Sequence, residues 1–543
     1  MSCLIKNAQI VIGDGETDVF VGDVLVEGET ITALGEVAYS DHKTAARTID
    51  ADGLTLAPGF VDTHNHGALG GTRPGPGGTP VACELALRAG VTKRICGVDG
   101  FSPAPVLPAQ RAEYAEQLRP LDGSIGRDWC WSTIAEFGAW HAGRSITDMG
   151  LYLGHSAVRR AVLGNAARPA TASELAAMAA LVRAEAPHTL GFSTGLVYHP
   201  AVYADRAELA ALLTAFGQVR PAALFPHLRS ESDMILPSLD ECLTACIDTG
   251  AAYCNEHTKI AGKENYDKIG ALEARLADGA ASVRTMANMY PYTAGSTTGD
   301  ALFPPQFRSG TRDDFRRALS AGDSRARMIH IIRSDTTSWD NFIYFSGGLD
   351  GIQIAGAAND RVFLGKRLGD VARAAGAKDL TSAAAFDAVF DYFLANDLEV
   401  TIITHYGSEL LMERLFRRDD MAICTDGLMP GPGQKPHPRS LGAFPKTLRM
   451  AREMGIPRKK ILWRMSTLPC RFLGLKDPVL RVGGDASMLL FDWNKVRENN
   501  DYENPMVLPT GIHQVWVHGV LAFDEGVFPK LERLPGRLLQ ARY

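Results

Sequence analysis

The sequence lacks the features that mark secreted, membrane-spanning and nucleic-acid-binding proteins. Its nine cysteines include no Cys-x-x-Cys pair, which indicates reduced thiols in a cytoplasmic protein rather than a disulfide framework. No run approaches the roughly 18 apolar residues of a membrane span, and the first residues lack the long apolar core of a signal peptide. Lysine and arginine are scattered and the formal net charge is only -6, so we expect a small-molecule substrate rather than nucleic acid or a membrane surface.

Both ends of the chain carry the signature of short β-strands. Residues 3–50 alternate apolar and polar side chains between glycine-containing turns, and the same alternation returns at 486–492 and 514–521. A period of two residues is typical of half-buried strands. We therefore predict one small β-sandwich formed by residues 1–57 together with residues 480–543.

The middle of the chain has a different pattern of apolar and polar residues. From Pro58, short apolar runs alternate with alanine- and leucine-rich stretches such as 172–186 and 236–249, an alternation typical of a parallel sheet with intervening helices. We predict a barrel over residues 58–479. A segment richer in proline, glycine and charge at about 296–351 interrupts this rhythm, and we interpret it as an insertion near the mouth of the barrel.

A His-x-His pair follows the first apolar strand of this central region. Alternate residues of a strand point to the same side, so His64 and His66 could both face one metal ion at the end of the strand. The active sites of such barrels lie at the carboxyl ends of their strands. The pair alone is also compatible with two unrelated histidines in ordered polar sites.

Three further polar residues follow short apolar runs in the same way: His227, His257 and Asp426. Each of them could stand at the carboxyl end of its own strand. Together with the His-x-His pair they offer the ligands that suit one or two divalent ions with an open position for water. Taken singly, each is more often structural; Asp426, which precedes a glycine, could simply cap a helix.

The order of these residues resembles the amidohydrolase superfamily. This resemblance rests on the segment from Pro58 to His66, followed by His227, His257 and Asp426. The sequence between these residues is similar to the N-acyl-D-amino-acid deacylase (D-aminoacylase) branch of the superfamily. The matching blocks are residues 154–159, 191–198, 226–231, 289–294, 437–439 and 515–519.

The resemblance implies a distorted (β/α)8 barrel of the TIM type beside a small β-domain, with an inserted segment. It also implies that His64 and His66 bind one metal ion and that His227 and His257 bind the other, with zinc as the expected ion. Asp426 would be both a metal ligand and the general acid and base that moves protons between water and the leaving nitrogen.

One position departs from the resembled family, which usually has a bridging cysteine after the second strand. Here the sequence reads Cys96-Gly-Val-Asp99-Gly-Phe-Ser102, and alignment on the glycines, Phe101 and Ser102 puts Asp99 in the cysteine's place. We favour Asp99 over Cys96 as the bridging ligand, because strand alternation leaves the two on opposite faces. A carboxylate is a harder ligand than a thiolate, so metal preference could differ.

Several groups near the predicted metal ligands could bind a substrate carboxylate. Lys259 lies two residues after a predicted ligand, Arg439 lies downstream of Asp426, and Tyr290 could add a hydroxyl donor. In the resembled deacylases the matching lysine, tyrosine and arginine hold the α-carboxylate, and Ser296 matches a weaker contact. Without the resemblance, each Lys or Arg would be read as a solvated surface charge.

Three functions remain open at this point. The first is hydrolysis of a linear amide, an N-acyl-D-amino acid above all, with metal-activated water as nucleophile. The second is hydrolysis of cyclic amides or N-substituted formamides, which the same metal site could support. The third is a non-catalytic interaction protein that keeps the fold and has lost its metal. The sequence predicts neither the oligomeric state nor the side chain of the substrate.

Overall fold

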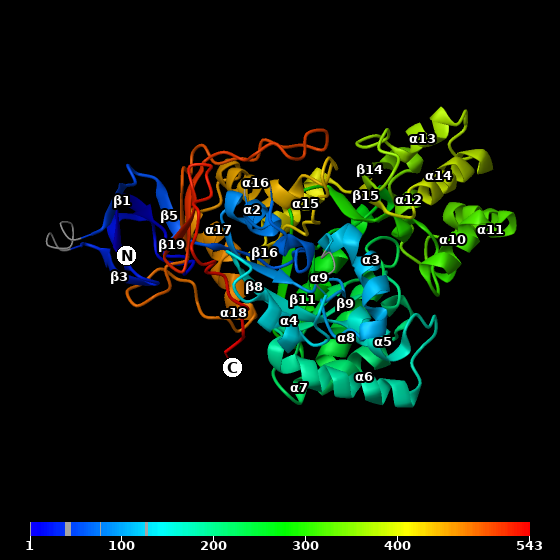
Figure 1. Ribbon diagram of the computed structural model, residues 1–543, viewed down its shortest axis with the longest axis horizontal. Helices are drawn as coiled ribbons and strands as arrows, with labels where there is room; N and C mark the ends of the chain where they lie inside the picture. Colours follow the sequence, from blue (N-terminus) through cyan, green and yellow to red (C-terminus); the bar gives the residue numbers. More distant parts are fainter. Residues whose placement is uncertain (1, 38–44, 76–77, 125–128, 543) are drawn as a thin grey trace.

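Both ends of the chain meet in one β-domain in the computed structural model, which describes residues 2–37, 45–75, 78–124 and 129–542 (Figure 1). Its eight strands form a single sheet in the order β19-β18-β17-β5-β1-β2-β3, with β4 branching from β1. They are β1 Ser2–Ile10, β2 Phe20–Glu27, β3 Thr30–Gly35, β4 Arg47–Asp50, β5 Thr55–Pro58, β17 Met488–Phe491, β18 Ile512–Val517 and β19 Val520–Asp524. Leu56 and Leu490 share one buried apolar cluster, so the predicted pairing of the two ends is confirmed.

The central region is a barrel of eight parallel strands, in the order β16-β12-β11-β10-β9-β8-β7-β6. The strands are β6 Phe60–Asp62, β7 Val91–Cys96, β8 Asp148–Gly154, β9 Gly191–Gly195, β10 Ala223–His227, β11 Ala252–Asn255, β12 Thr285–Met289 and β16 Met421–Ile423. Most are buried along their whole length, as expected where helices cover a parallel sheet. This confirms the predicted distorted (β/α)8 barrel.

The barrel closes just beyond the ends of its first and last strands. The N–H of Asp426 donates to the carbonyl of His64 at 2.8 Å, and the N–H of His66 donates to the carbonyl of Gly427 at 3.1 Å. Below this closure the interior is filled by apolar side chains from successive strands, with the rings of Tyr152 and Phe225 stacked 3.8 Å apart. The carboxyl ends of the strands therefore stand above a packed core.

The barrel helices begin where the sequence predicted them. The stretch 172–186 is α6, Ala172–Glu185, whose first turn carries a capping box between Thr171 and Glu174. The stretch 236–249 is α8, Ile235–Thr249, which ends at Gly250 with φ +71°, a left-handed conformation that suits glycine. The other helices of this region are α2 Val81–Arg88, α3 Arg111–Asp122, α4 Ile134–His141, α5 His155–Leu163, α7 Arg206–Gly217, α9 Ile269–Ala280, α15 Glu409–Phe416, α16 Arg439–Glu453, α17 Arg458–Met465 and α18 Thr467–Phe472.

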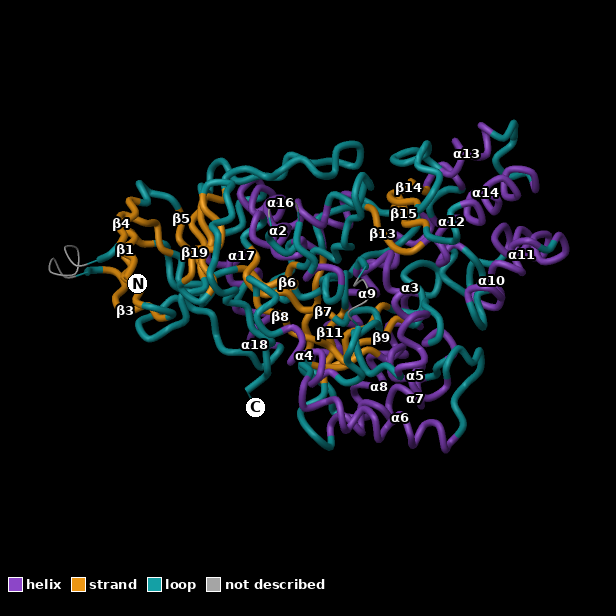
Figure 2. The backbone as a smooth tube through the Cα atoms, viewed as in Figure 1, coloured by secondary structure: helices purple, strands orange, loops and turns teal. Residues whose placement is uncertain are grey.

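An inserted unit stands apart from both sheets, at the upper right of Figure 1, and its strands form a third group in Figure 2. Three antiparallel strands in the order β13-β15-β14 are joined to five helices. The strands are β13 Ala294–Thr298, β14 Ile352–Ala357 and β15 Val400–His405, and the helices are α10 Arg312–Ser320, α11 Gly322–Ser334, α12 Phe342–Phe345, α13 Leu368–Ala374 and α14 Ala383–Ala395.

This unit runs farther along the chain than the range of about 296–351 predicted from composition. Its last helix, α14, is rich in alanine and phenylalanine, and its last strand, β15, is an apolar run. Both therefore have the same sequence pattern as the helices and strands of the barrel. Local composition could not separate them from the barrel. The division of the chain at residues 57 and 479 stays a prediction.

A buried histidine joins the β-domain to the barrel. His518, in the turn between β18 and β19, lies 2.9 Å from Asp148 at the start of β8 and 2.6 Å from Asp485. Burial by itself lowers the pKa of His518, but its hydrogen bonds to the two aspartates raise it to about 9. The imidazolium form therefore stabilises this junction at neutral pH. Among the helices in the described parts of the chain, none has the length and apolar content needed to cross a membrane.

Candidate metal centre and substrate pocket

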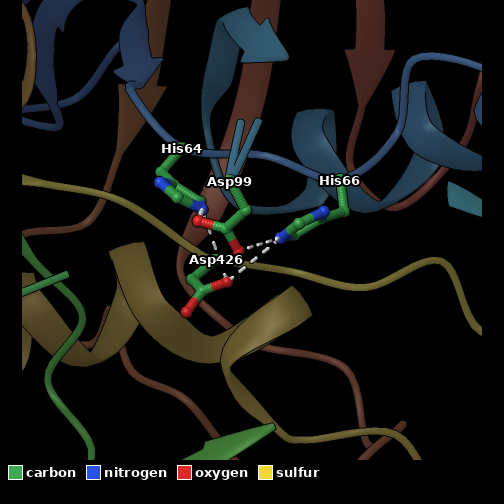
Figure 3. Close-up of side chains that lie close together, drawn as sticks. All are labelled: His64, His66, Asp99 and Asp426. Carbon is green, nitrogen blue, oxygen red and sulfur yellow. Dashed lines mark ion pairs between the residues drawn. The ribbon is translucent and has the colours of Figure 1, made fainter. Parts of the chain in front are cut away.

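Four of the predicted ligands converge at the closure of the barrel (Figure 3). His64 Nε2 lies 3.4 Å from Asp99 Oδ1 and 3.7 Å from Asp426 Oδ1, while His66 Nε2 lies 3.5 Å from Asp99 Oδ2 and 3.4 Å from Asp426 Oδ1. All four side chains are buried. The His-x-His segment continues from β6, so both imidazoles face the same space.

The second histidine pair, His227 and His257, lies close to His64 and His66, with Asp99 between the two pairs. His227, the last residue of β10, and His257, just after β11, have Nδ1 and Nε2 atoms 3.1 Å apart. Asp99 Oδ1 lies 3.7 Å from His227 Nδ1 and 3.4 Å from His257 Nε2. Asp99 therefore stands between the two pairs, within reach of both, and the ligand atoms of each group lie within 4.8 Å of one another.

The close approach of these imidazole nitrogens and carboxylate oxygens fits a site for one or two cations. His64 Nε2 is fully buried and has no hydrogen-bond partner among the described residues, which is costly unless another group satisfies it. Burial by itself lowers the pKa of His64, but the carboxylates of Asp99 and Glu256 raise it to about 10. The surrounding carboxylates therefore favour positive charge in this space, and neutral imidazole together with carboxylate is a donor set that suits zinc.

Three of these candidate ligands adopt a backbone conformation that is rare outside glycine. Asp99, His257 and Asp426 have φ values of 53°, 31° and 47°, and they are among nine such non-glycine residues in the described parts of the chain. Strain of this kind gathers at functional sites, where the surrounding structure holds it. No helix begins at Asp426, since α16 starts only at Arg439, so the capping role considered for Asp426 is wrong.

Cys96 lies outside this cluster. Its thiol is 3.8 Å from the side-chain oxygen of Asn65, and it belongs to an apolar cluster with Leu151. Burial raises the pKa of Cys96 to about 12, which keeps the thiol protonated. Asp99, and not Cys96, therefore lies among the four histidines. This agrees with the expectation that the two residues lie on opposite faces of the strand.

Three buried carboxylates behind the histidines were not predicted. Glu256 contacts Nδ1 of His64 and accepts from the Asn288 amide at 3.0 Å. Asp122 lies 3.6 Å from Nδ1 of His66, and Glu231 lies 3.0 Å from Nδ1 of His257. Such partners orient a ligating imidazole and increase its basicity. Glu231 and Glu256 lie in blocks next to predicted ligands, which could have revealed them; Asp122, at the end of α3, carries no sequence signal.

The predicted carboxylate-binding residues surround one small cavity of about 20 Å³ beside the ligands. Lys259 Nζ lies 2.6 Å from Glu231 Oε1. The Arg439 guanidinium lies 4.4 Å from the centre of the Tyr290 ring, and no residue in the described parts of the chain is hydrogen-bonded to the buried Tyr290 hydroxyl. Ser296, on β13 of the inserted unit, donates to the carbonyl of Ile402 at 2.8 Å.

Arg439 also contacts a candidate ligand. Its Nη1 lies 2.8 Å from Asp426 Oδ2, although a turn-rich segment separates the two residues in the sequence. Burial by itself raises the pKa of Asp426, but Arg439 and the histidines hold it well below its usual range. The site therefore combines a fully ionised carboxylate with cationic groups on one side of the candidate metal ligands.

Comparison with known proteins agrees with this geometry. The chain is 30% identical to an N-acyl-D-glutamate deacylase of Alcaligenes xylosoxydans xylosoxydans over 95% of this chain and 92% of that protein. It is 29% identical to a D-aminoacylase of the same organism over 93% and 91%. The crystal structure of an N-acyl-D-glutamate deacylase from Bordetella bronchiseptica, complexed with zinc and a phosphonate mimic of the tetrahedral intermediate, superposes with a TM-score of 0.79 at 25% identity over 99% of both chains. No family model matches the chain.

Proposed function

The chain belongs to the N-acyl-D-amino-acid deacylase family of the amidohydrolase superfamily, and from that premise we propose that it hydrolyses N-acyl-D-amino acids to a carboxylate and a free D-amino acid. The observation that carries the proposal is that the candidate metal ligands and the candidate carboxylate-binding residues lie around the same cavity. Six candidate ligands converge from five strand ends, and Lys259, Tyr290 and Arg439 line the cavity beside them.

We propose that zinc is the resident ion. His64, His66 and Asp426 would hold one ion, His227 and His257 a second, and Asp99 would bridge the two positions. The fit rests on the orphaned Nε2 of His64 and on the imidazole and carboxylate donor set. When bound, such an ion polarises an amide carbonyl and lowers the pKa of water to about 7.

Asp426 would serve as general base and then as general acid. Arg439 and the histidines depress its pKa, so it is unprotonated at neutral pH, the form that a general base requires. Its Oδ1 faces the ligand space while its Oδ2 is held by Arg439. One oxygen is thus positioned to take a proton from attacking water and to deliver it to the departing nitrogen, which is otherwise a poor leaving group.

Lys259, Tyr290 and Arg439 would bind the α-carboxylate of the substrate. Their cationic and hydroxyl donors line the same cavity, and the unpartnered Tyr290 hydroxyl is free to donate. Ser296 would add a weaker contact from the inserted unit. A substrate without a carboxylate would leave the buried Tyr290 hydroxyl and Arg439 Nε, which lack partners among the described residues, unpaired, a cost of about 1–3 kcal/mol for each, which disfavours cyclic amides and N-substituted formamides.

A panel of N-acetyl, N-formyl and N-succinyl derivatives of D- and L-amino acids tests the proposal directly. We expect turnover of D-configured substrates that bear an α-carboxylate and none of their L-enantiomers or carboxamides. Hydantoins and formamides that lack an α-carboxylate are assayed beside the panel, and preferred turnover of these would move the function to the second class. Zinc-loaded protein that turns over none of these compounds would contradict the proposal.

A small-molecule substrate and a cytoplasmic location complete the proposal. All nine cysteines are unpaired thiols in the structure, and unpaired thiols are typical of reducing compartments. Localisation of the tagged full-length chain by cell fractionation checks this point; recovery outside the cytoplasm would contradict it.

A further inference from the structure

A buried aspartate links the inserted unit to the barrel beside the candidate metal ligands. Asp340 lies between α11 and α12 and is only 1% exposed. Its carboxylate accepts from the hydroxyl of Ser230 at 3.3 Å, from the N–H of Glu231 at 3.2 Å and from the hydroxyl of Ser232. All three donors belong to the loop between β10 and α8. One carboxylate of the inserted unit therefore makes three hydrogen bonds to one loop of the barrel.

The charge of Asp340 has no cationic partner in the described parts of the chain. Its hydrogen bonds come from neutral hydroxyl and N–H donors, and no lysine, arginine or histidine of these parts forms an ion pair with it. Burial and the nearby Glu231 carboxylate raise the pKa of Asp340 to about 6, although its hydrogen bonds lower it. A carboxylate buried without a counter-ion is costly. Such a cost indicates a role, and the bonds of Asp340 place that role in the loop that carries Glu231.

Glu231 contacts three groups of the site. Its Oε1 lies 2.6 Å from Lys259 Nζ and 3.0 Å from His257 Nδ1. Its Oε2 lies 3.9 Å from His227 Nε2, and neither of these two atoms has a hydrogen-bond partner within the described ranges. One carboxylate thus faces both histidines of the second pair and the lysine that we propose binds the substrate carboxylate. A small displacement of Glu231 would change all three contacts at once.

The inserted unit fixes Asp340 from its own side as well. The amide group of the next residue, Asn341, is fully buried and donates to the carbonyls of Ile332 at 2.7 Å and Asp335 at 2.9 Å. Its oxygen accepts from the N–H of Tyr344 at 3.1 Å, in the short helix α12. These bonds hold the backbone beside Asp340 in one place. The position of Asp340 is therefore set by the inserted unit.

We propose that Asp340 is a positioning residue, which fixes the loop at Ser230–Ser232 and so holds Glu231 against His257 and Lys259. The inference rests on the proposed function, because that function makes His257 a metal ligand and Lys259 a carboxylate-binding group. It gives the inserted unit a role in the geometry of the second histidine pair. Asp340 acts through Glu231 and contacts none of the candidate ligands itself.

A double-mutant cycle between Asp340 and Glu231 tests the proposal, with the Kd for zinc in chelator competition as the readout. E231Q loses a charged partner behind a candidate ligand, so the Kd should rise about 10- to 100-fold. D340A acts one step farther away and should raise it about 5- to 30-fold, and D340N, which keeps one acceptor oxygen, should raise it less. In the E231Q background D340A should change the Kd by less than about 2-fold, because the route through Glu231 is already lost.

The KM for an N-acetyl-D-amino acid is the second readout. D340A should raise KM about 3- to 10-fold, because Lys259 loses the orientation that Glu231 provides. In the E231Q background the same substitution should change KM by less than about 2-fold. Residues that support the fold independently of each other give additive effects, so this non-additivity separates positioning through Glu231 from general support of the fold.

The matched control is N396A, a change at another buried polar residue of the inserted unit. Asn396 is fully buried and accepts from the N–H groups of Asn359 at 2.9 Å and Asp360 at 2.8 Å. Its loss removes a comparable set of buried hydrogen bonds away from the loop that carries Glu231. N396A should therefore lower the thermal transition but leave the zinc Kd and KM within about 2-fold of wild type.

The outcomes separate this inference from the function on which it rests. A wild-type zinc Kd in D340A, equal changes in both backgrounds, or a rise in N396A as large as that in D340A would each overturn the positioning role. If D340A lacks a cooperative thermal transition, D340N takes its place in the cycle, and equal changes in both backgrounds refute the role in the same way. The zinc titrations need no turnover, so protein that binds zinc but hydrolyses no N-acyl-D-amino acid would overturn the proposed function while the cycle still decides the role of Asp340. Protein that binds no zinc would overturn both.

Discussion

Glu256→Gln removes a buried charge behind His64 while it preserves the volume of the side chain. Glu256 contacts His64 Nδ1 through one oxygen and accepts from the Asn288 amide through the other. Glutamine has a single acceptor oxygen, so one of these two buried donors would face an NH2 group and lose its bond. An unsatisfied buried donor costs about 1–3 kcal/mol, and loss of a partner behind a metal-bound histidine lowers metal affinity about 10- to 100-fold.

We therefore expect the Kd for zinc in Glu256→Gln to rise about 10- to 100-fold, or about 1.4–2.7 kcal/mol, in competition titrations against a chromogenic chelator. Glu185→Gln is the matched control. Glu185 is equally buried, and within the described ranges its carboxylate accepts only from the N–H of Ile134, a bond that the glutamine oxygen can keep, so zinc affinity should not change. A Kd for Glu256→Gln equal to that of wild type would refute the claim that Glu256 holds His64 as a ligand.

Three further predictions concern the ligands, the carboxylate clamp and the domain junction. Asp99→Ala should lower the zinc content, measured by atomic emission, more than Cys96→Ala does, and the reverse order would show that Cys96 is the bridging ligand. Lys259→Ala should raise KM for an N-acyl-D-amino acid about 10- to 100-fold with little change in kcat, because the lysine binds the carboxylate equally in ground and transition states; an equal fall in kcat would contradict this. The pKa of His518 is about 9 in the folded protein and 6.5 in the unfolded chain. This shift stabilises the folded state by at most about 3 kcal/mol. The stabilisation is complete below pH 6.5 and is lost as the pH rises through 9. Thermal unfolding of wild type and His518→Gln should therefore differ at pH 6 and converge near pH 10. The control is His513→Gln, because His513 is only half-buried and contacts a single carboxylate, Glu525. A pH-independent difference for His518→Gln, or one like that of the control, would refute the claim.

The local patterns predicted the elements well because each strand and helix carries its own periodicity. The helices at 172–186 and 236–249 begin and end within one or two residues of the predicted positions. The inserted unit was harder to delimit. Its β15 pairs with β13 across more than a hundred residues and with β14 across more than forty, and nothing local distinguishes the sequences of β14 and β15 from those of barrel strands.

The candidate ligands could be predicted for a geometric reason. Every one of them lies at or just after the carboxyl end of a barrel strand, and all such strand ends meet at one face. The supporting residues could not be found in this way. Asp122 comes from the end of a helix and Asp340 from the inserted unit, so their positions depend on tertiary packing rather than on strand order. The same holds for Arg439, whose contact with Asp426 spans a turn-rich loop.

The central claim is that the convergent histidines and aspartates form a zinc centre that hydrolyses N-acyl-D-amino acids. It is tested most directly by removing metal from the purified protein with a chelator, titrating zinc back, and following kcat/KM for an N-acetyl-D-amino acid and its L-enantiomer. We predict that activity disappears on removal, returns with one or two equivalents of zinc, and is confined to the D-substrate. Full activity in metal-free protein, or none at any zinc level, would contradict the claim.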